Sequence, residues 1–365
     1  MHVLVVMRDD RDQVFGGDTV MVRKIEKYLR PYGVHFEYST AWQLKEEFKA
    51  DIVHITFLHL VESVQHTVQW AQIHRIPVVI SPLFEIPLVM WFQRAITWSR
   101  KWRLLSKIFG RRFTQRLYVA WRTERIKRSS QWQMQRDLLQ SIKIVTNSYY
   151  ERDRLARWFD LSCLDATVVP LGIDPEVFNR ECVGHPPAAL NGLTGYVLEV
   201  GRIEGRKNQL GLLKALYDLP VPIVFLGQAN QSSYEAAYVE ECRQLAMDRG
   251  EVYFLEHVPE ADLPSLYSMA AVHVLPSWFE FPGLVTLEAA ACGCKVVSTS
   301  FSPIYEYLGE DAWYCRPDSI RSIRVATQQA LSSPISKDLQ ARVLNNFTWE
   351  KTARKMFDVY QQLLS

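Results

Sequence analysis

Short apolar runs alternate with amphipathic segments, and this alternation constrains the fold of the chain more than any other feature. His2–Met7 is an apolar run, and Val20, Met21, Ile25 and Leu29 follow it at helical spacing. Similar runs occur at residues 34–38, 52–55, 78–81, 142–146 and 167–171, with a helical stretch near 42–48. Strands that alternate with helices predict a parallel sheet buried on both faces.

A second series of the same kind begins at residue 196. Its strand-like runs are residues 196–200, 221–226, 252–255, 272–275 and 295–298. Residues 172–195 are rich in Pro and Gly and weakly patterned, which is typical of a linker. We therefore expect an α/β chain of two Rossmann-like, doubly wound domains facing a cleft: residues 1–171 and 196–347. Residues 348–365 place Ala353, Met356 and Val359 on one face and predict a terminal helix.

The composition is that of an ordinary globular protein with one unusual segment. Of 365 residues, 48% are apolar and 22% charged, which excludes a coiled coil, a collagen-like chain and a small disulfide scaffold. The net charge is only +2, but residues 91–140 hold 13 Lys or Arg and 2 Asp or Glu. This basic segment predicts an anionic partner.

The cysteines and the hydropathy indicate a location. The six cysteines show no CxxC spacing and no paired histidines, so we expect neither a zinc site nor a disulfide framework. No apolar run approaches 18 residues, and the first run is too short for a signal peptide. We expect a cytoplasmic protein with reduced thiols, peripheral on the inner membrane face where it meets a membrane.

The first candidate site follows the first strand, because ligands of open α/β sheets lie beyond the carboxyl ends of the strands. Gly16 and Gly17 could bring backbone amides close to an anion, with Asp18 capping the next helix. A plain turn with a capped helix explains the same residues.

The second candidate site is the loop 201–208, directly after the run 196–200. It carries Arg202 and Lys207 just before a helix. Two such cations can neutralise a diphosphate. Exposed cations are also common in loops, so Arg202 and Lys207 could equally be solvated surface residues.

The third candidate site is the segment 277–289. Pro282 suits the first position of a helix, and Gly283 lets a ligand approach the free amides there. Glu280 precedes this helix and Glu288 lies about a turn and a half inside it. Such carboxylates can accept hydrogen bonds from sugar hydroxyls. They could equally be a solvated loop acid and an ordinary helix residue.

Together these motifs resemble the retaining GT-B glycosyltransferases of family 4, also called glycosyl transferases group 1. The resemblance lies in Gly201-Arg202 with Lys207, in Glu280 and Glu288 with seven residues between them, and in the run 289–297. Further segments also look like recurring motifs of that family: residues 51–54, 145–148, 169–174 with Phe178, and 305–309. The resemblance implies a terminal helix that crosses back to the first domain and closure around residues 172–195.

The resemblance also implies a role for each matched residue. Arg202 and Lys207 would bind the diphosphate of a nucleotide sugar and stabilise it as it leaves. Glu288 would hold the ribose, and Glu280 the transferred sugar. Other donor contacts would come from Gly16, Gly17, Val258, Phe281, Pro282, Gly283 and Leu284. No DxD metal motif is evident among these matched residues, so we expect no metal and no cofactor, only a UDP- or GDP-sugar as substrate.

Two departures from the family pattern concern the sugar and the reacting carbon. Members usually carry Glu-Gly-Phe-Gly where this chain reads residues 280–283 as Glu-Phe-Pro-Gly, which puts donor identity in question. Many members carry a histidine after the fourth strand, near Leu83, and here there is none. Glu85 or a backbone group could replace it, and His54 and His59 are alternatives, although a histidine at a strand end is often structural.

The basic segment coincides with a predicted insertion, residues 88–137, which holds five of the eleven tryptophans. If residues 88–109 form one helix, a single stripe contains Trp91, Ala95, Trp98, Trp102, Leu105 and Phe109. Such a helix could lie among the headgroups of an anionic membrane. Alternatively, it packs its aromatic rings on the core and leaves a solvated basic face, or binds another protein or an acidic glycan. No RNA-binding pattern accompanies it, so we expect no nucleic acid.

These observations favour a retaining glycosyltransferase that moves a sugar from a nucleotide-diphosphate sugar to an acceptor hydroxyl. The acceptor would be a glycan or a lipid-linked precursor in surface polysaccharide or glycolipid synthesis at a membrane face. Two alternatives stay open: a nucleotide-sugar epimerase, and a non-catalytic scaffold that binds glycan or lipid.

Overall fold

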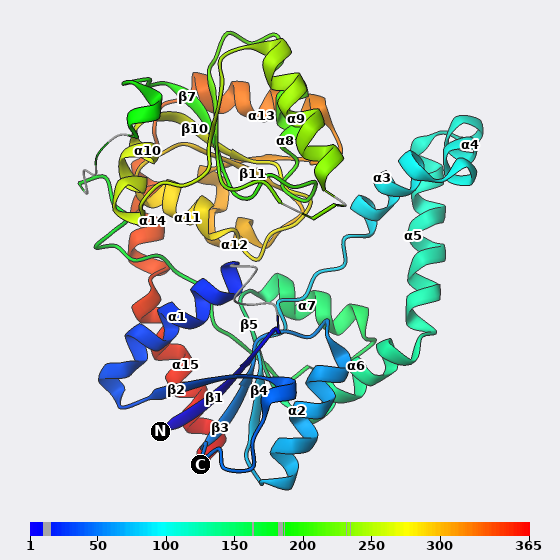
Figure 1. Cartoon of the computed structure of the whole chain (residues 1–365), viewed down its shortest axis with the longest axis vertical. Coiled ribbons are helices and arrows are strands. Elements are labelled where there is room, and N and C mark those ends of the chain that lie inside the picture. Colours follow the sequence, from blue (N-terminus) through cyan, green and yellow to red (C-terminus); the bar gives the residue numbers. More distant parts are fainter. Residues whose placement is uncertain (10–15, 163, 182–184, 186, 231, 234) are drawn as a thin grey trace. The chain divides into compact units, whose positions relative to one another are not determined.

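The computed structural model describes all residues except 10–15, 163, 182–184, 186, 231 and 234. The chain divides into two compact units (Figure 1). Unit 1 is Met1–Leu171 with Trp349–Ser365, and unit 2 is Gly172–Thr348. Each unit holds one six-stranded sheet whose described pairings are all parallel, which confirms the expected α/β class with two doubly wound domains.

The sheet of unit 1 has the order β2-β1-β3-β4-β5-β6. Its strands are β1 (His2–Met7), β2 (His35–Thr40), β3 (Ile52–Ile55), β4 (Val78–Ile80), β5 (Lys143–Thr146) and β6 (Ala166–Val168). Its helices are α1 (Gly17–Leu29), α2 (Val61–Ile73), α3 (Leu88–Trp98), α4 (Arg100–Phe109), α5 (Arg111–Lys127), α6 (Ser130–Ser141), α7 (Tyr149–Trp158) and α15 (Trp349–Leu364), with short 3-10 turns η1 (Arg30–Tyr32) and η2 (Ala41–Gln43). The central strands are mostly apolar because helices cover both faces of a parallel sheet.

The terminal helix α15 belongs to unit 1, as the sequence predicts. It packs along α1, and its predicted stripe of Ala353, Met356 and Val359 is buried. Tyr360 Oη lies 2.7 Å from His54 Nδ1 on β3, and Thr352 Oγ1 donates a hydrogen bond to Pro170 O. The chain therefore closes unit 1 with residues from both of its ends.

The sheet of unit 2 has the order β12-β11-β10-β7-β8-β9. Its strands are β7 (Tyr196–Val200), β8 (Ile223–Leu226), β9 (Val252–Leu255), β10 (Ala270–Leu275), β11 (Val296–Thr299) and β12 (Trp313–Cys315). Its helices are α8 (Gln209–Ala215), α9 (Ala236–Arg249), α10 (Leu263–Met269), α11 (Leu284–Ala291), α12 (Ile304–Leu308), α13 (Ile320–Ser332) and α14 (Lys337–Asn346), with 3-10 turns η3 (Ala188–Leu190), η4 (Glu260–Asp262) and η5 (Gly309–Asp311).

The segment expected to be a linker, residues 172–195, packs as part of unit 2. Ile173, Phe178 and Leu190 lie in the same core cluster as the strands. Ile173 also forms a parallel bridge with Thr348, the last residue of unit 2.

Two local predictions in unit 1 are wrong. Residues 42–48 are not a helix, because only the short turn η2 forms there. Phe48 N donates a hydrogen bond to Lys45 O in a following turn, and the Phe48 side chain packs partly buried against the core. Residues 88–109 are not one helix either, because the extended backbone of Ser99 ends α3 and begins α4. With this bend, the ring centroids of Trp102 and Tyr118 lie 5.0 Å apart.

Helices α3, α4 and α5 form an extension that we call the arm, residues 88–127 (Figure 1). The arm has a small hydrophobic cluster of its own, Phe92, Trp102 and Tyr118. Part of the predicted aromatic stripe therefore packs within the arm, whereas the alternative interpretation expected it to pack on the domain core.

Candidate functional site

The strand order of unit 2 locates a candidate ligand site. Read from β9, the order is β9-β8-β7-β10-β11-β12, so the direction of winding reverses between β7 and β10. Ligands of doubly wound sheets bind beyond the carboxyl ends of the strands at this reversal. The loops 201–208 and 276–283 follow β7 and β10, so two of the predicted motifs meet there.

A network of charged side chains joins these two loops. Lys207 Nζ lies 2.7 Å from Glu280 Oε1, and Arg206 Nη1 lies 3.2 Å from the same oxygen. Arg206 Nε binds Glu204 Oε1 at 3.0 Å, and Arg202 Nη2 lies 3.5 Å from Glu204 Oε2. The structure therefore brings together the predicted residues Arg202, Lys207 and Glu280.

The side chains of the network range from buried to exposed. The side chains of Glu280 and Lys207 are 7% and 10% exposed, whereas Arg206 is 24% and Arg202 is 39% exposed. The network has three cations and two carboxylates, which leaves an excess positive charge. Its two more exposed cations, Arg206 and Arg202, reach solvent. An anion that approaches this edge of the sheet would meet Arg202 first.

Burial and ion pairing oppose each other in this network. Burial alone would raise the pKa of Glu280, but Lys207 and Arg206 outweigh it and the pKa lies below its usual value. Burial lowers the pKa of Lys207, and Glu280 offsets only part of that effect. Glu280 is therefore ionised at neutral pH and holds the cations in place.

A second carboxyl group lies beneath the network, on β7. Glu199 is 1% exposed, and among the described residues neither of its oxygens has a hydrogen-bond partner. Burial raises the pKa of Glu199 well above its usual value, with Lys207 opposing that shift and Glu280 adding to it. The burial of Glu199 thus favours its neutral form, which would add no charge under the network.

Gly201 makes room for Lys207. Its φ of 151° lies outside the range that most residues adopt, and a Cβ there would lie 2.9 Å from Lys207 Cε. Next to Lys207, Asn208 donates from Nδ2 to the carbonyls of Pro276 and Pro317, 3.1 Å each. A glycine at the strand end and an asparagine at the helix start thus position the lysine.

The start of α11 corrects one prediction and supports another. Pro282 is not its first residue: the helix begins at Leu284, and Gly283 caps it with a left-handed φ of 88°. Phe281 lies before the cis peptide bond to Pro282, and its ring packs 5.7 Å from that of Phe279. The first amides of α11 have no partners within the helix, so this end suits an anion.

Glu288 and Val258 occupy separate positions in unit 2. Glu288 lies on α11 and accepts a 3.0 Å hydrogen bond from Tyr267 Oη, which fixes one oxygen of the carboxylate. Val258 is 8% exposed and packs in the core cluster, so only its backbone could contact a ligand. Neither residue takes part in the contacts described for the network.

Gly16 and Gly17 belong to unit 1, at the start of α1. Gly16 O accepts from the amides of Thr19 and Val20, which begins the helix. The expectation that Asp18 caps this helix is wrong: its carboxylate instead binds Arg8 Nε at 2.8 Å. Among the described residues, no atom lies within 4 Å of a Cβ placed on Gly17.

His54 is structural, as its strand-end position suggested. Its Nδ1 contacts Tyr360 Oη at 2.7 Å and its Nε2 contacts Ser81 Oγ at 2.9 Å. Burial lowers the pKa of His54 to about 4, so the ring is neutral. His59 is exposed beyond the same strand.

The loop after β4, where the family histidine is missing, is held by α7. Leu83 has a left-handed φ of 44°, which is strained for a leucine. Glu85 forms an ion pair with Arg154 and accepts a hydrogen bond from Ile86 N. Burial raises the pKa of Glu85, and Arg154 opposes that shift. This pairing gives Glu85 a structural role in the loop.

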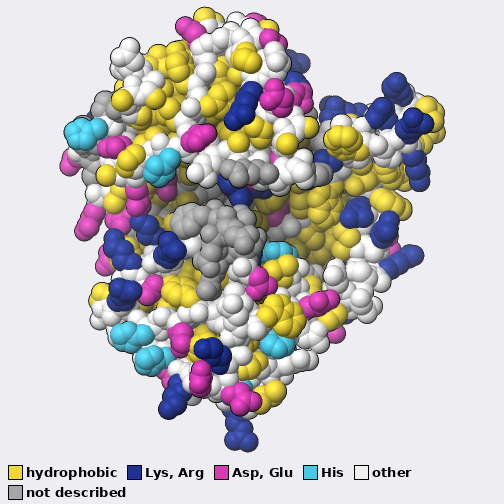
Figure 2. All heavy atoms as spheres, in the orientation of Figure 1, with side chains coloured by type: hydrophobic (Ala, Val, Ile, Leu, Met, Phe, Trp, Pro, Cys, Tyr) yellow, Lys and Arg dark blue, Asp and Glu magenta, His cyan; other side chains and the backbone are white. Residues whose placement is uncertain are grey.

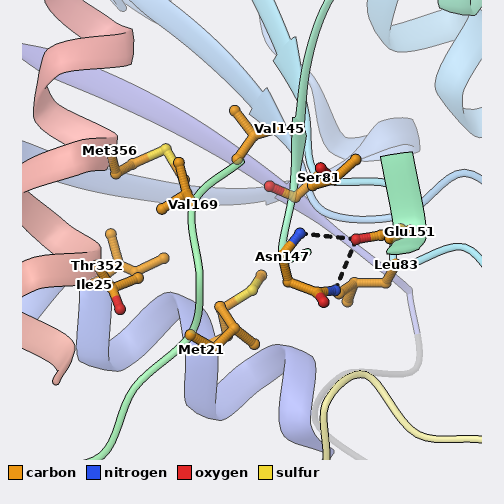
Figure 3. A pocket seen from close by; sticks show the side chains of 12 residues that line it. Met21, Ile25, Ser81, Leu83, Val145, Asn147, Glu151, Val169, Thr352 and Met356 are labelled. Atoms are coloured by element: carbon orange, nitrogen blue, oxygen red, sulfur yellow. Dashed lines mark hydrogen bonds between the residues drawn. The ribbon is translucent and has the colours of Figure 1, made fainter. Parts of the chain in front are cut away.

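A small pocket in unit 1 lies at the carboxyl ends of β4 and β5 (Figure 3). Glu151 lines it and accepts from Phe84 N at 2.8 Å, from Asn147 N at 2.8 Å and from Asn147 Nδ2 at 2.7 Å. Burial raises the pKa of Glu151 to about 7, although these hydrogen bonds oppose the shift. Ser81 and Leu83 line the same pocket, so it adjoins the loop after β4.

Sequence reasoning missed Arg206, Glu204 and Glu151. The pattern Ser148-x-x-Glu151 is a capping-box sequence, and Ser148 Oγ does accept from Glu151 N, so a signal was present. For Glu204 and Arg206 the sequence shows only charges within the loop. Among the described residues, no group of three or more His, Cys, Asp or Glu side chains is arranged to hold a metal ion.

Comparisons with known proteins bear on this arrangement. Residues 187–347 match the family model for glycosyl transferases group 1. O-antigen chain mannosyltransferase B of Escherichia coli is 28% identical over 233 residues, which are 60% of this chain and 60% of that protein. Glycogen synthase of Mycobacterium tuberculosis is 27% identical over 60% of this chain and 54% of its own length. The matches thus span little more than half of these relatives.

Solved structures share the whole fold. Sucrose-phosphate synthase from Thermosynechococcus elongatus superposes with a TM-score of 0.76 at 19% identity, covering 100% of this chain and 99% of that one. Anabaena Alr3699/HepE in complex with UDP and glucose gives 0.67 at 15% identity, covering 99% of this chain and 100% of that one. Residues 187–347 are therefore similar to the glycosyl transferases group 1 family, and the chain shares the two-sheet GT-B fold of those solved structures.

Proposed function

We propose that the protein is a glycosyltransferase that takes its sugar from a nucleoside diphosphate sugar. The observation that carries the proposal is the network of Arg202, Arg206 and Lys207 on Glu204 and Glu280, at the winding reversal of unit 2. Its excess positive charge and the nearby start of α11 suit a diphosphate. The match of residues 187–347 to glycosyl transferases group 1 supports the same assignment.

Within this proposal each side chain has a distinct task. Arg202 is the most exposed cation and would bind the diphosphate, while Lys207 would stabilise the charge that develops as the diphosphate leaves. Both cations that hold Glu280 contact Oε1, so Oε2 is the atom we assign to the sugar hydroxyls. Glu288, oriented by Tyr267, would accept from the ribose hydroxyls.

The finer reaction follows the family resemblance. We propose transfer with retention by a front-face displacement and without a metal ion. The acceptor oxygen forms the new bond to the anomeric carbon, the bond from that carbon to the diphosphate oxygen breaks, and the acceptor proton passes to the leaving diphosphate. A UDP- or GDP-sugar would be the donor and a glycan or lipid-linked hydroxyl at a membrane face the acceptor, which suits surface polysaccharide or glycolipid synthesis. The complexes of Alr3699/HepE with UDP, with UDP and glucose, and with UDP-glucose favour a uridine nucleotide.

The experiment is release of nucleoside diphosphate from candidate UDP- and GDP-sugars in the presence of a membrane extract. We expect release by the wild type and a loss of about 100-fold or more in Arg202→Ala, because a preorganised positive charge is removed. Arg321→Ala removes an exposed arginine of α13 in the same unit and is the matched control. Full activity of Arg202→Ala would refute the site, and no release from any donor would favour the scaffold alternative.

A further inference from the structure

The turn between α4 and α5 forms a tip, residues 107–113, that exposes large apolar side chains. Ile108 is 62% exposed, and Phe109 and Phe113 are each 57% exposed. The rings of Phe109 and Phe113 lie 5.9 Å apart, so they form one apolar patch rather than scattered positions. Gly110, with a left-handed φ of 80°, makes the sharp turn that places these residues together.

The apolar surface continues along both helices of the arm. Leu117 and Trp121 follow Phe113 at intervals of four on α5 and are 45% and 41% exposed. Leu104 precedes Ile108 by four on α4 and is 58% exposed. Residues four apart share one face of a helix, so these side chains extend the patch from the tip. Figure 2 shows apolar and basic side chains side by side on the arm at the upper right.

The cations around this surface are available to an external partner. The arm has eleven Lys or Arg residues and one acid, Glu124, which lies 3.4 Å from Arg128. Lys107 and Arg112 flank the apolar residues of the tip and are exposed. In the described part of the chain, neither has a carboxylate within ion-pair distance. Their charge is therefore not neutralised by the protein.

Phe109 and Phe113 lie outside the hydrophobic cluster of the arm. Phe92, Trp102 and Tyr118 already form its core, with Trp91 and Leu105 packed against them. Trp102 is only 8% exposed, so the tryptophan at the centre of the predicted stripe is not available to a membrane. The exposed apolar residues outside this cluster include those of the tip, Leu104 on α4 and Leu117 on α5, while the half-exposed Trp121 ring also contacts Trp102 and Tyr118.

We propose that the tip docks on an anionic lipid bilayer. Ile108, Phe109 and Phe113 would enter the boundary of the acyl chains, while Lys107 and Arg112 would contact lipid phosphates. A soluble polyanion would use the cations but leave the apolar patch in water, so the combination favours a lipid surface. The inference rests on the proposed function only in placing the acceptor at a membrane, and it can be tested without donor or turnover.

The test is flotation of the full-length protein with vesicles of phosphatidylglycerol and phosphatidylcholine in equal parts, and with vesicles of phosphatidylcholine alone. We expect the wild type to float with the anionic vesicles and much less with the neutral ones. Ile108→Ser should weaken binding by roughly tenfold, from the apolar area that no longer enters the lipid. Ile73→Ser, which removes a 79% exposed isoleucine from α2, is the matched control and should bind normally.

The basic residues are tested separately. Replacing Lys107 and Arg112 together with glutamine should weaken binding about 25-fold, at about fivefold per cation. Lys49→Gln with Arg321→Gln, which removes two exposed cations outside the arm, should bind like the wild type. Equal binding to neutral and anionic vesicles, or no binding to either, overturns the proposal. Loss with the charge variant but not with Ile108→Ser also overturns it, because only a soluble polyanion site would then remain.

Discussion

The ion pair between Lys207 and Glu280 leads to an asymmetric prediction. Removing the carboxylate with Glu280→Gln leaves a lysine that is 10% exposed without a counter-charge at ion-pair distance in the described structure. We expect this variant to lose about 3–5 kcal/mol in the free energy of unfolding. Lys207→Met should lose less, about 1–3 kcal/mol, because Glu280 keeps Arg206 at 3.2 Å.

The double variant separates the pair from its surroundings. At an N–O distance of 2.7 Å and an effective dielectric constant of about 20, the attraction is about 6 kcal/mol before desolvation is subtracted. Combining Glu280→Gln with Lys207→Met removes both buried charges, so its loss should be about that of Glu280→Gln alone. The coupling energy of the cycle should therefore equal the loss of Lys207→Met, about 1–3 kcal/mol.

The assay is hydrogen exchange of β7 along a urea titration, which follows unit 2 separately from unit 1. The matched control is the exposed pair Lys214 and Glu241 in the same unit, 3.0 Å apart with side chains 43% and 57% exposed. Lys214→Met with Glu241→Gln should show a coupling below about 1 kcal/mol. Additive losses at Lys207 and Glu280, or a milder effect of Glu280→Gln than of Lys207→Met, would refute the reasoning.

Three further predictions concern space and protonation. Gly201→Ala should abolish nucleotide release, because the added Cβ displaces Lys207. The control Gly250→Ala, at a φ of 74° and with no described atom within 4 Å of the added Cβ, should lose only about 1 kcal/mol in the free energy of unfolding. Release assays measure the first effect and thermal unfolding measures the second. The folded pKa of His54 is about 4, below the ordinary value of 6.5, so His54 contributes stability above pH 6.5 that is lost as the pH falls through 4. In unfolding measured against pH, the free energy of the wild type should fall by about 3 kcal/mol from this group, and His54→Gln should lack that fall. Glu151, with a folded pKa of about 7 above 4.5, contributes stability below pH 4.5 that is lost as the pH rises through 7; a Glu151→Gln variant with the same pH profile as the wild type would contradict this assignment.

Local patterns were sufficient for most strands and for the loops that follow them, although β12 (Trp313–Cys315) was not predicted. The runs 2–7, 52–55, 196–200 and 252–255 are strands with the expected bounds, because each is apolar and short and lies between turn signals. Patterns failed where tertiary contacts decide. Residues 88–109 have the periodicity of one helix, yet the chain bends at Ser99 because the bend lets aromatic rings of three helices pack together.

The sequence by itself determined that Arg202, Lys207 and Glu280 follow strands of one parallel sheet, since strand ends can be read from local periodicity. Only the tertiary structure decided that Lys207 and Arg206 share one oxygen of Glu280, because a contact across 73 residues depends on the strand order. The same holds for the arm. Its composition gave the charge, but which aromatic side chains are core and which are exposed depends on how three helices pack, and that packing leaves Ile108, Phe109 and Phe113 in solvent.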